Sequence, residues 1–153
     1  MNRSRYLTRR LDHIDRAIIA ALCENGRRAI KEVAELLDMA TPSITARIDK
    51  LKDAGAITGY TAVIDPGAFG LDVAAFVRMS AMPGQMNKLI QMVKDTPEIV
   101  ETFHITGKEC LQAKIVVRDM QSLEAVVDRF GSCASTETSV IQSVTVAQRL
   151  PKL

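Results

Sequence analysis

The feature of this chain that most constrains its fold is a predicted pair of short amphipathic helices within residues 29–55. Thr41 and Pro42 are expected to start the second helix, because Thr caps helix N-termini well and Pro is tolerated as the first helical residue. Gly55 is the favoured left-handed residue beyond its end. Apolar residues recur at helical steps of three and four, namely Ile30, Val33, Ala34 and Leu37 in the first helix and Ile44, Ile48 and Leu51 in the second.

The outer surface of the second helix carries small polar and basic side chains, which suit the major groove of DNA. Lys50 faces outward and is expected to contact a base edge, whereas Arg47 lies on the flank of the apolar stripe and is expected to hold a phosphate. An ordinary helical hairpin in a protein core is the alternative for this segment taken alone. The predicted DNA-binding residues are Thr41, Ser43, Thr45, Ala46, Arg47 and Lys50.

The flanking sequence favours the DNA-binding interpretation. Upstream, a further helix of about three turns is marked by Leu11, Ile14, Ile18 and Leu22. Downstream, residues 56–64 are rich in β-branched residues and read as an extended ribbon that ends at Asp65-Pro66-Gly67. Three helices followed by a ribbon is the order of a winged helix-turn-helix. Four arginines precede the first helix: Arg3, Arg5, Arg9 and Arg10. They would form either a basic arm that follows DNA phosphates or a solvated terminus.

The second half of the chain predicts a different architecture. Its elements in order are a strand over 73–81, a helix from 86 that closes before Pro97, strands over 98–106 and 110–118 joined by the turn Gly107-Lys108-Glu109, a helix over 122–130 and a strand over 136–148. This βαββαβ order is the ferredoxin-like arrangement, with helices on one face of an antiparallel sheet. The predicted fold class is α+β, with a winged helix-turn-helix domain over 1–64, a linker over 65–71 and a ferredoxin-like domain over 72–153.

The sheet of the second domain is expected to mediate self-association. Its strands carry apolar residues on both faces, and a layer of two helices covers only one face. We therefore expect at least a homodimer formed through this domain. The apolar residues assigned to the sheet faces are Val73, Val77, Ile115, Val117, Val140 and Val144.

Composition narrows the class of protein. The chain has 153 residues, of which 47% are hydrophobic and 25% charged, so it can fold, and no apolar run is long enough to span a membrane. The chain has three cysteines that form no CxxC pair, and its only histidines are His13 and His104. This set suggests neither a zinc site nor a disulfide framework. We expect a reduced cytoplasmic protein without a metal or cofactor, and no catalytic constellation is indicated. Cys23 is expected to pack within a helix.

Several segments resemble the Lrp/AsnC (feast/famine) family of transcriptional regulators. They are Leu11-Asp12-His13-Ile14-Asp15-Arg16-Ala17-Ile18-Ile19, Gly26-Arg27-Arg28, Val33-Ala34-Glu35-Leu36-Leu37, Arg47-Ile48-Asp49-Lys50-Leu51, Gly55-Ala56-Ile57-Thr58-Gly59-Tyr60 and Ile105-Thr106-Gly107. The resemblance implies a helix-turn-helix domain that binds double-stranded DNA and a second domain that dimerises and senses amino acids or related metabolites. It also implies assembly into tetramers, octamers or larger rings.

Two positions depart from the family pattern. Ala40 stands where the family usually has a capping Ser, so Thr41 is expected to cap instead and to start the helix one residue later. Cys110 stands where the family has an Asp that can meet a ligand's ammonium group, so weaker binding of ordinary amino acids is expected. Cys110 is interpreted as a packed cysteine, with a redox sensor as the alternative. The predicted effector-binding residues are Thr106, Gly107, Cys110, Thr136 and Thr138.

Three classes of function remain open at this point. The first is a sequence-specific transcription regulator that responds to an amino acid or related metabolite. The second is a low-specificity architectural DNA-binding protein without an effector, for which DNA binding would fall steeply with salt and show no sequence preference. The third is a metabolite-binding module whose helix-turn-helix has lost its role.

Overall fold

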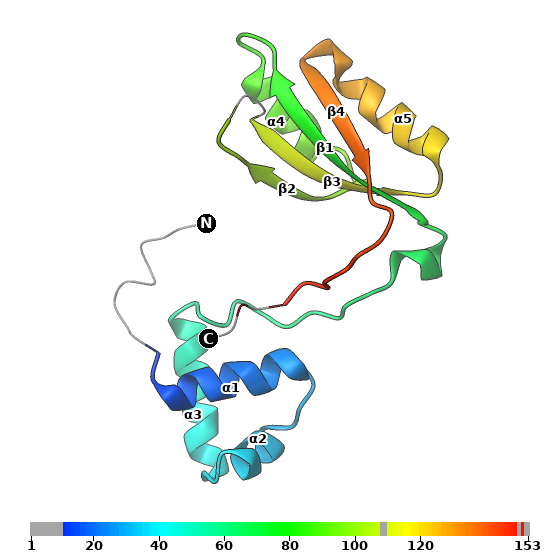
Figure 1. Ribbon diagram of the computed structural model, residues 1–153. Coiled ribbons are helices and arrows are strands. Elements are labelled where there is room, and N and C mark those ends of the chain that lie inside the picture. The colour runs from blue at the N-terminus through cyan, green and yellow to red at the C-terminus, as the bar shows by residue number, and fades with distance from the viewer. Residues whose placement is uncertain (1–10, 108–109, 150, 152–153) are drawn as a thin grey trace. The chain divides into compact units, whose positions relative to one another are not determined.

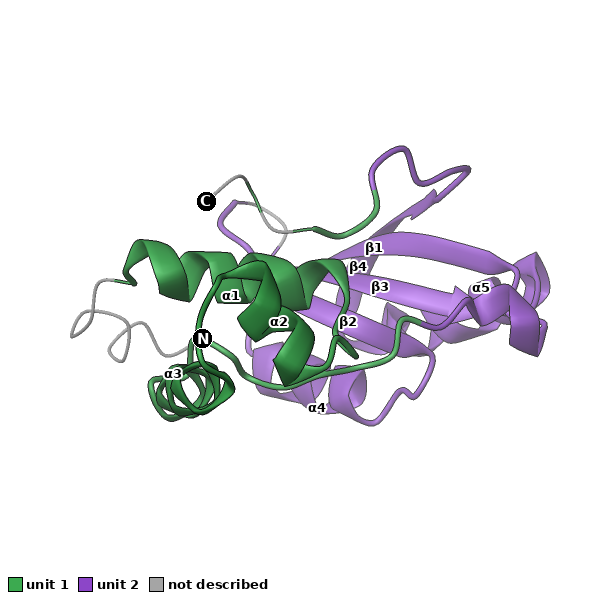
Figure 2. Cartoon of the chain, turned by 90° about the horizontal axis from the view of Figure 1, so that it is seen from below, with its two compact units in different colours: residues 1–63, 147–153 green, residues 64–146 purple. Residues whose placement is uncertain are grey.

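The computed structural model describes residues 11–107, 110–149 and 151, and these divide between two compact units (Figures 1 and 2). The first unit lies within residues 1–63 and 147–153, and the second spans 64–146. The arginines of the predicted basic arm and the turn residues Lys108 and Glu109 fall outside the described residues. No described helix has the length and apolar character that a membrane crossing requires.

Three helices build the first unit: α1 (His13–Glu24), α2 (Ile30–Leu36) and α3 (Thr41–Asp53) (Figure 1). Asp12 and Asp15 begin α1 with a reciprocal capping box, in which each carboxylate accepts from the other residue's backbone N–H. The predicted apolar stripes are confirmed in the core of this unit except at Ile30, which is 39% exposed. The buried residues of this core are Ile18, Val33, Ala34, Ile44, Ile48 and Leu51.

Of the two predicted ends of α3, the C-terminal one is confirmed and the N-terminal one is wrong. The predicted cap at Thr41 is wrong, because Thr41 is already helical and the cap position is Ala40, which makes no side-chain cap hydrogen bond. The predicted end is confirmed: Gly55 has a left-handed φ of 72°. There the N–H groups of Gly55 and Ala56 donate to the carbonyls of Lys52 and Leu51, which closes the helix in a Schellman motif.

The ribbon predicted after α3 does not pair into a wing within the described residues. Residues 58–65 form neither helix nor strand, and the side chains of Tyr60, Val63 and Ile64 are exposed. A β-rich composition favours extended backbone, but a strand also needs a partner for its ladder hydrogen bonds. A short 3-10 turn, η2 (Pro66–Phe69), follows in the predicted linker and is capped by Asp65.

The second unit confirms the predicted βαββαβ order. Its elements are β1 (Val73–Ala81), α4 (Met86–Lys94), β2 (Ile99–His104), β3 (Leu111–Val117), α5 (Met120–Asp128) and β4 (Ala134–Val140), with a 3-10 turn, η3 (Arg129–Ser132), before the last strand. The four strands form an antiparallel sheet in the order β2-β3-β1-β4. Both helices lie on one side of this sheet (Figure 1).

The last strand is shorter than predicted. It was expected over 136–148, but β4 ends at Val140, and the described residues beyond it form no strand. The reason lies in its partner: β1 begins at Val73, and the N–H of Ile141 donates to the carbonyl of Ala74 near that end. Beyond this point only Val73 of β1 remains to continue the ladder.

The register of the sheet separates a covered face from an open face. Residues that lie opposite each other in an antiparallel ladder point to the same face. Val77, which is fully buried against the helices, pairs with Ala113 and Thr138. Phe76, next in the chain, pairs with Lys114 and Ser139 on the open face.

The apolar residues assigned to self-association therefore need correcting. Val73 and Val117 pair with each other, and Ile115 and Val140 both pair with the buried Ala75. Val73, Val77, Ile115 and Val117 pack in the helix-covered core, whereas Val140 shares their face by register but is 44% exposed. Val144 lies beyond β4. The alternation of a strand separates its two faces but does not say which one the helices will cover.

Candidate DNA interface and effector region

The exposed side of α3 carries most of the predicted DNA-binding residues. Thr41, Ser43, Ala46 and Lys50 are exposed, whereas Thr45 and Arg47 are half-buried. The Thr45 hydroxyl donates to the carbonyl of Thr41 at 3.0 Å, so this side chain is turned back along its own helix. Beside the N-terminus of α3 lies a hollow of about 400 Å³, lined in part by Lys31 of α2 and Asp38 of the turn.

The turn before α3 is formed by backbone contacts. The N–H of Met39 donates to the carbonyl of Ala34 at 2.9 Å, and Asp38 has a positive φ of 50°. Asp is among the few residues that enter the left-handed region with small cost, because its short polar side chain can hydrogen-bond locally. The turn therefore sets the direction in which α3 leaves α2, without any side-chain cap on α3.

Arg47 makes the main polar contact between α1 and α3. Its Nη1 donates to Oδ2 of Asp12 at 2.7 Å and to Oδ1 of Asp15 at 2.8 Å. Only 1% of the Asp15 side chain is exposed. The two carboxylates come from the capping box of α1, so one guanidinium ties the start of that helix to the middle of α3.

The electrostatics of this cluster are mutually reinforcing. The backbone N–H of Asp15, and next the Arg47 guanidinium, hold the pKa of Asp12 below its usual value. Hydrogen bonds to Asp12 and then to Asp15 raise the pKa of Arg47. The phosphate contact predicted for Arg47 stays a prediction, and it would have to use guanidinium nitrogens other than Nη1.

Sequence reasoning missed the role of Asp12 and Asp15 in this contact. Both stand in the segment Leu11-Asp12-His13-Ile14-Asp15, and their three-residue spacing is that of a capping box. That local signal predicts the cap on α1 but not the partner on α3, because Arg47 lies 32 to 35 residues away in the chain.

Of the predicted effector residues, Cys110 and Thr136 lie on either side of Met79, near the end of β1. The N–H of Cys110 donates to the carbonyl of Met79 at 3.0 Å, and Met79 pairs with Thr136 of β4 on its other side. Thr138 is two residues further along β4 and shares the face of Thr136. Thr106 and the positive-φ Gly107 (129°) are exposed in the turn between β2 and β3.

The three cysteines occupy different environments. Cys110 is half-buried, and its thiol donates to the Met79 carbonyl at 3.3 Å, which agrees with its interpretation as a packed residue. Cys133 is fully buried, with its Sγ 3.6 Å from Sδ of Met92. The packing role expected for Cys23 is wrong, because this residue is exposed on α1. It falls outside the stripe of α1 that contacts the other two helices.

Comparisons with known proteins cover both units. Residues 11–52 match the family model of the AsnC-type helix-turn-helix domain, and residues 74–151 match that of the Lrp/AsnC ligand binding domain. The chain is 32% identical over 127 residues to the HTH-type transcriptional regulator FL11 of Pyrococcus horikoshii. This alignment covers 83% of the chain and 84% of FL11.

Solved structures give the same result. The structure of LrpC from Bacillus subtilis superimposes with a TM-score of 0.86 and 26% identity, and the match covers 92% of this chain and all of LrpC. The transcriptional regulator NMB0573 of Neisseria meningitidis, solved as a complex with L-Met, gives a TM-score of 0.87 and 26% identity, over 93% of this chain and 97% of that one.

Proposed function

The chain belongs to the Lrp/AsnC family of HTH-type transcriptional regulators, and we propose that it reads double-stranded DNA with the exposed side of α3. The observation that carries this proposal is that α3 has one buried apolar side and one exposed polar side. Ile44, Ile48 and Leu51 are buried against α1 and α2, while Ser43 and Lys50 are exposed. An exposed recognition helix with hydroxyl and amino donors suits base edges and phosphates of the major groove.

A gel-shift series on operator DNA tests this interface. Lys50→Ala should weaken specific binding by about 1–3 kcal/mol if Lys50 contacts a base, and should relax specificity at one position of the site. Lys88→Ala is the matched control, because Lys88 is an exposed lysine on α4 of the other unit. Equal affinities for the two variants would remove Lys50 from the interface. Binding that is steeply salt-dependent but insensitive to DNA sequence would instead favour the architectural alternative.

We further propose that the protein acts as a homodimer, or a higher oligomer, through the open face of the sheet. Support comes from aromatic side chains on the face of the sheet that neither α4 nor α5 covers (Figure 1): Phe76 is 36% exposed and Phe103 46%. Phe103 pairs with Gln112 and Phe76 with Lys114, in register with the open face. A dimer would place two copies of α3 on the half-sites of a pseudo-palindromic operator.

Sedimentation of the full chain tests the dimer. Phe76→Asp puts a charge in the centre of the proposed interface and should shift the protein toward monomer at micromolar concentration. Phe69→Asp is the control, because Phe69 is 70% exposed but lies in the η2 turn outside the sheet. An unchanged sedimentation coefficient for Phe76→Asp would exclude this face as the interface.

The effector proposed for the second unit is an amino acid or a related metabolite. Support comes from the match to the Lrp/AsnC ligand binding domain and from the L-Met complex of the Neisseria meningitidis relative. We place it at Thr106, Gly107, Cys110, Thr136 and Thr138. Gly107 leaves room for backbone N–H groups to approach a carboxylate, and the threonines offer hydroxyls.

Calorimetry with Cys110→Asp tests this placement. The added carboxylate would meet a ligand's ammonium group, so amino-acid binding should strengthen about ten-fold, the usual size of a charge-assisted hydrogen bond. Cys23→Asp, which adds the same charge on α1, should leave binding unchanged. Tight binding by the unmodified chain that neither Cys110 nor Thr138 substitutions affect would refute the placement.

A further inference from the structure

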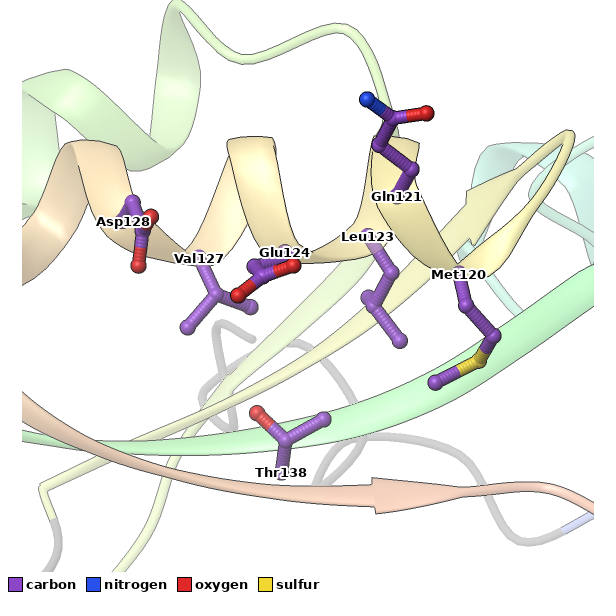
Figure 3. A pocket seen from close by; sticks show the side chains of 7 residues that line it. All are labelled: Met120, Gln121, Leu123, Glu124, Val127, Asp128 and Thr138. Carbon is purple, nitrogen blue, oxygen red and sulfur yellow. The ribbon is translucent and has the colours of Figure 1, made fainter.

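A second feature of the sheet unit is a cavity of about 420 Å³, open to solvent, between α5 and the edge strand β4 (Figure 3). This volume falls within the range of small-molecule sites. Its lining residues on α5 include the apolar Met120, Leu123 and Val127 and the acidic Glu124 and Asp128. Thr138 lines it from β4 and points toward α5 (Figure 3).

The two carboxylates give the cavity a single sign of charge. Glu124 and Asp128 are four residues apart, which places them one helical turn from each other on the same side of α5. Both carboxylates are exposed, and within the described part of the chain neither has a hydrogen-bond or ion-pair partner. No Lys or Arg lines the cavity. Like charges at this spacing repel, so a cation between them would stabilise the helix.

The apolar side chains restrict what kind of cation fits. Ca²⁺ binds six to eight oxygen ligands, and Mg²⁺ requires an octahedral set of oxygen ligands. Three of the α5 side chains that line this cavity are apolar and offer no oxygen ligand. An organic ammonium group matches the arrangement better. Its N–H groups would donate to Glu124, Asp128 and the Thr138 hydroxyl, and its carbon chain would lie on Met120, Leu123 and Val127.

We propose that this cavity binds a small organic cation, a protonated amine that carries an apolar chain. The inference goes beyond the function proposed above, because the cavity is separate from the β2–β3 turn. In the sheet order β2-β3-β1-β4, two strands lie between β2 and β4. Thr138 is the one residue shared with the proposed effector region.

Calorimetry on the full chain tests the proposal with three probes of equal length: n-hexylamine, 1-hexanol and hexanoate. We expect hexylamine to bind once per chain, hexanol to bind at least ten-fold more weakly and hexanoate not to bind. Glu124→Gln and Asp128→Asn should each weaken hexylamine binding about ten-fold, and the double variant should abolish it. Glu101→Gln, which removes an exposed carboxylate from the open face of the same sheet, should bind like the unmodified chain.

Three results would overturn the proposal. They are equal binding of hexylamine and hexanol, binding that neither acidic substitution weakens, and no binding of hexylamine at millimolar concentration. The first and third use only the unmodified chain, so they decide the matter even if a variant misfolds. Gel shifts with the same proteins separate this inference from the proposed function: if the amine fails to bind while operator DNA is still bound, only the cavity assignment falls.

Discussion

The two units hold their helices in place by different means. The sheet unit buries fourteen residues in one continuous core, and its cross-strand ion pair, Arg78–Glu137, lies on the exposed open face. The described part of the helix-turn-helix unit has a core cluster of six buried apolar residues and adds the contact of Arg47 with Asp12 and the buried Asp15. A small core provides little apolar area to fix the angle between helices. The comparison indicates that a polar contact between helices can fix their relative orientation where the apolar core between them is small.

The largest effect should come from the core of the sheet unit. Phe130 is fully buried between the sheet and its helices, so Phe130→Ala should lower the free energy of unfolding by about 3–5 kcal/mol. Hydrogen exchange with mass spectrometry reads the two units separately. It should show faster exchange in the sheet unit and little change in α1 to α3. Equal acceleration in both units would mean that their stabilities are coupled.

The second effect should fall on the helix-turn-helix unit. Asp15→Ala removes a buried acceptor of the Arg47 guanidinium, and we expect a loss of about 1–3 kcal/mol, measured by exchange in α1 and α3. DNA affinity should fall too, since α3 would lose its attachment to α1. Asp53→Ala is the control, an exposed carboxylate at the end of α3. If the two variants exchanged equally, the ionic contact would not orient α3.

A smaller effect is expected for the ion pair of the sheet unit. Arg78 and Glu137 are partly exposed, so Arg78→Ala should change stability by only about 0.2–1 kcal/mol, and less at high salt. Chemical denaturation at low and high salt measures this. A loss as large as that for Asp15→Ala would contradict the contrast between the units.

The smallest effect should be a pH dependence specific to α1. The folded-state pKa of Asp12 is depressed, so its ionised form stabilises the fold above the unfolded-state pKa, and this contribution is lost as pH falls through the lower folded value. Asp12→Asn keeps a good N-cap but removes the charge. It should reduce the acid sensitivity of exchange in α1 below about pH 4. Acid sensitivity in α5, where the pKa of Asp119 is also lowered by its cap hydrogen bonds from Ser122, should not change.

Local patterns in the sequence predicted most of the fold. Helical and alternating periodicity located all three helices of the first unit and the βαββαβ order of the second, and β1 was predicted with its observed bounds. The errors in the predicted strands fell where a local pattern needed a distant partner. Within the described residues, 58–65 have strand-like composition but pair with no strand, and β4 ends near the residue at which its antiparallel partner β1 begins.

The sequence by itself determined the helices and the order of elements in the sheet unit, and through its motifs which family the chain resembles, because periodicity and turns act over a few residues. Only the tertiary structure decided that Arg47 meets Asp12 and Asp15 and which face of the sheet the helices cover. The same holds for the cavity that joins Glu124 and Asp128 to Thr138. Each of these depends on which distant segments come together, and contacts between residues far apart in the chain leave no periodic trace in one sequence.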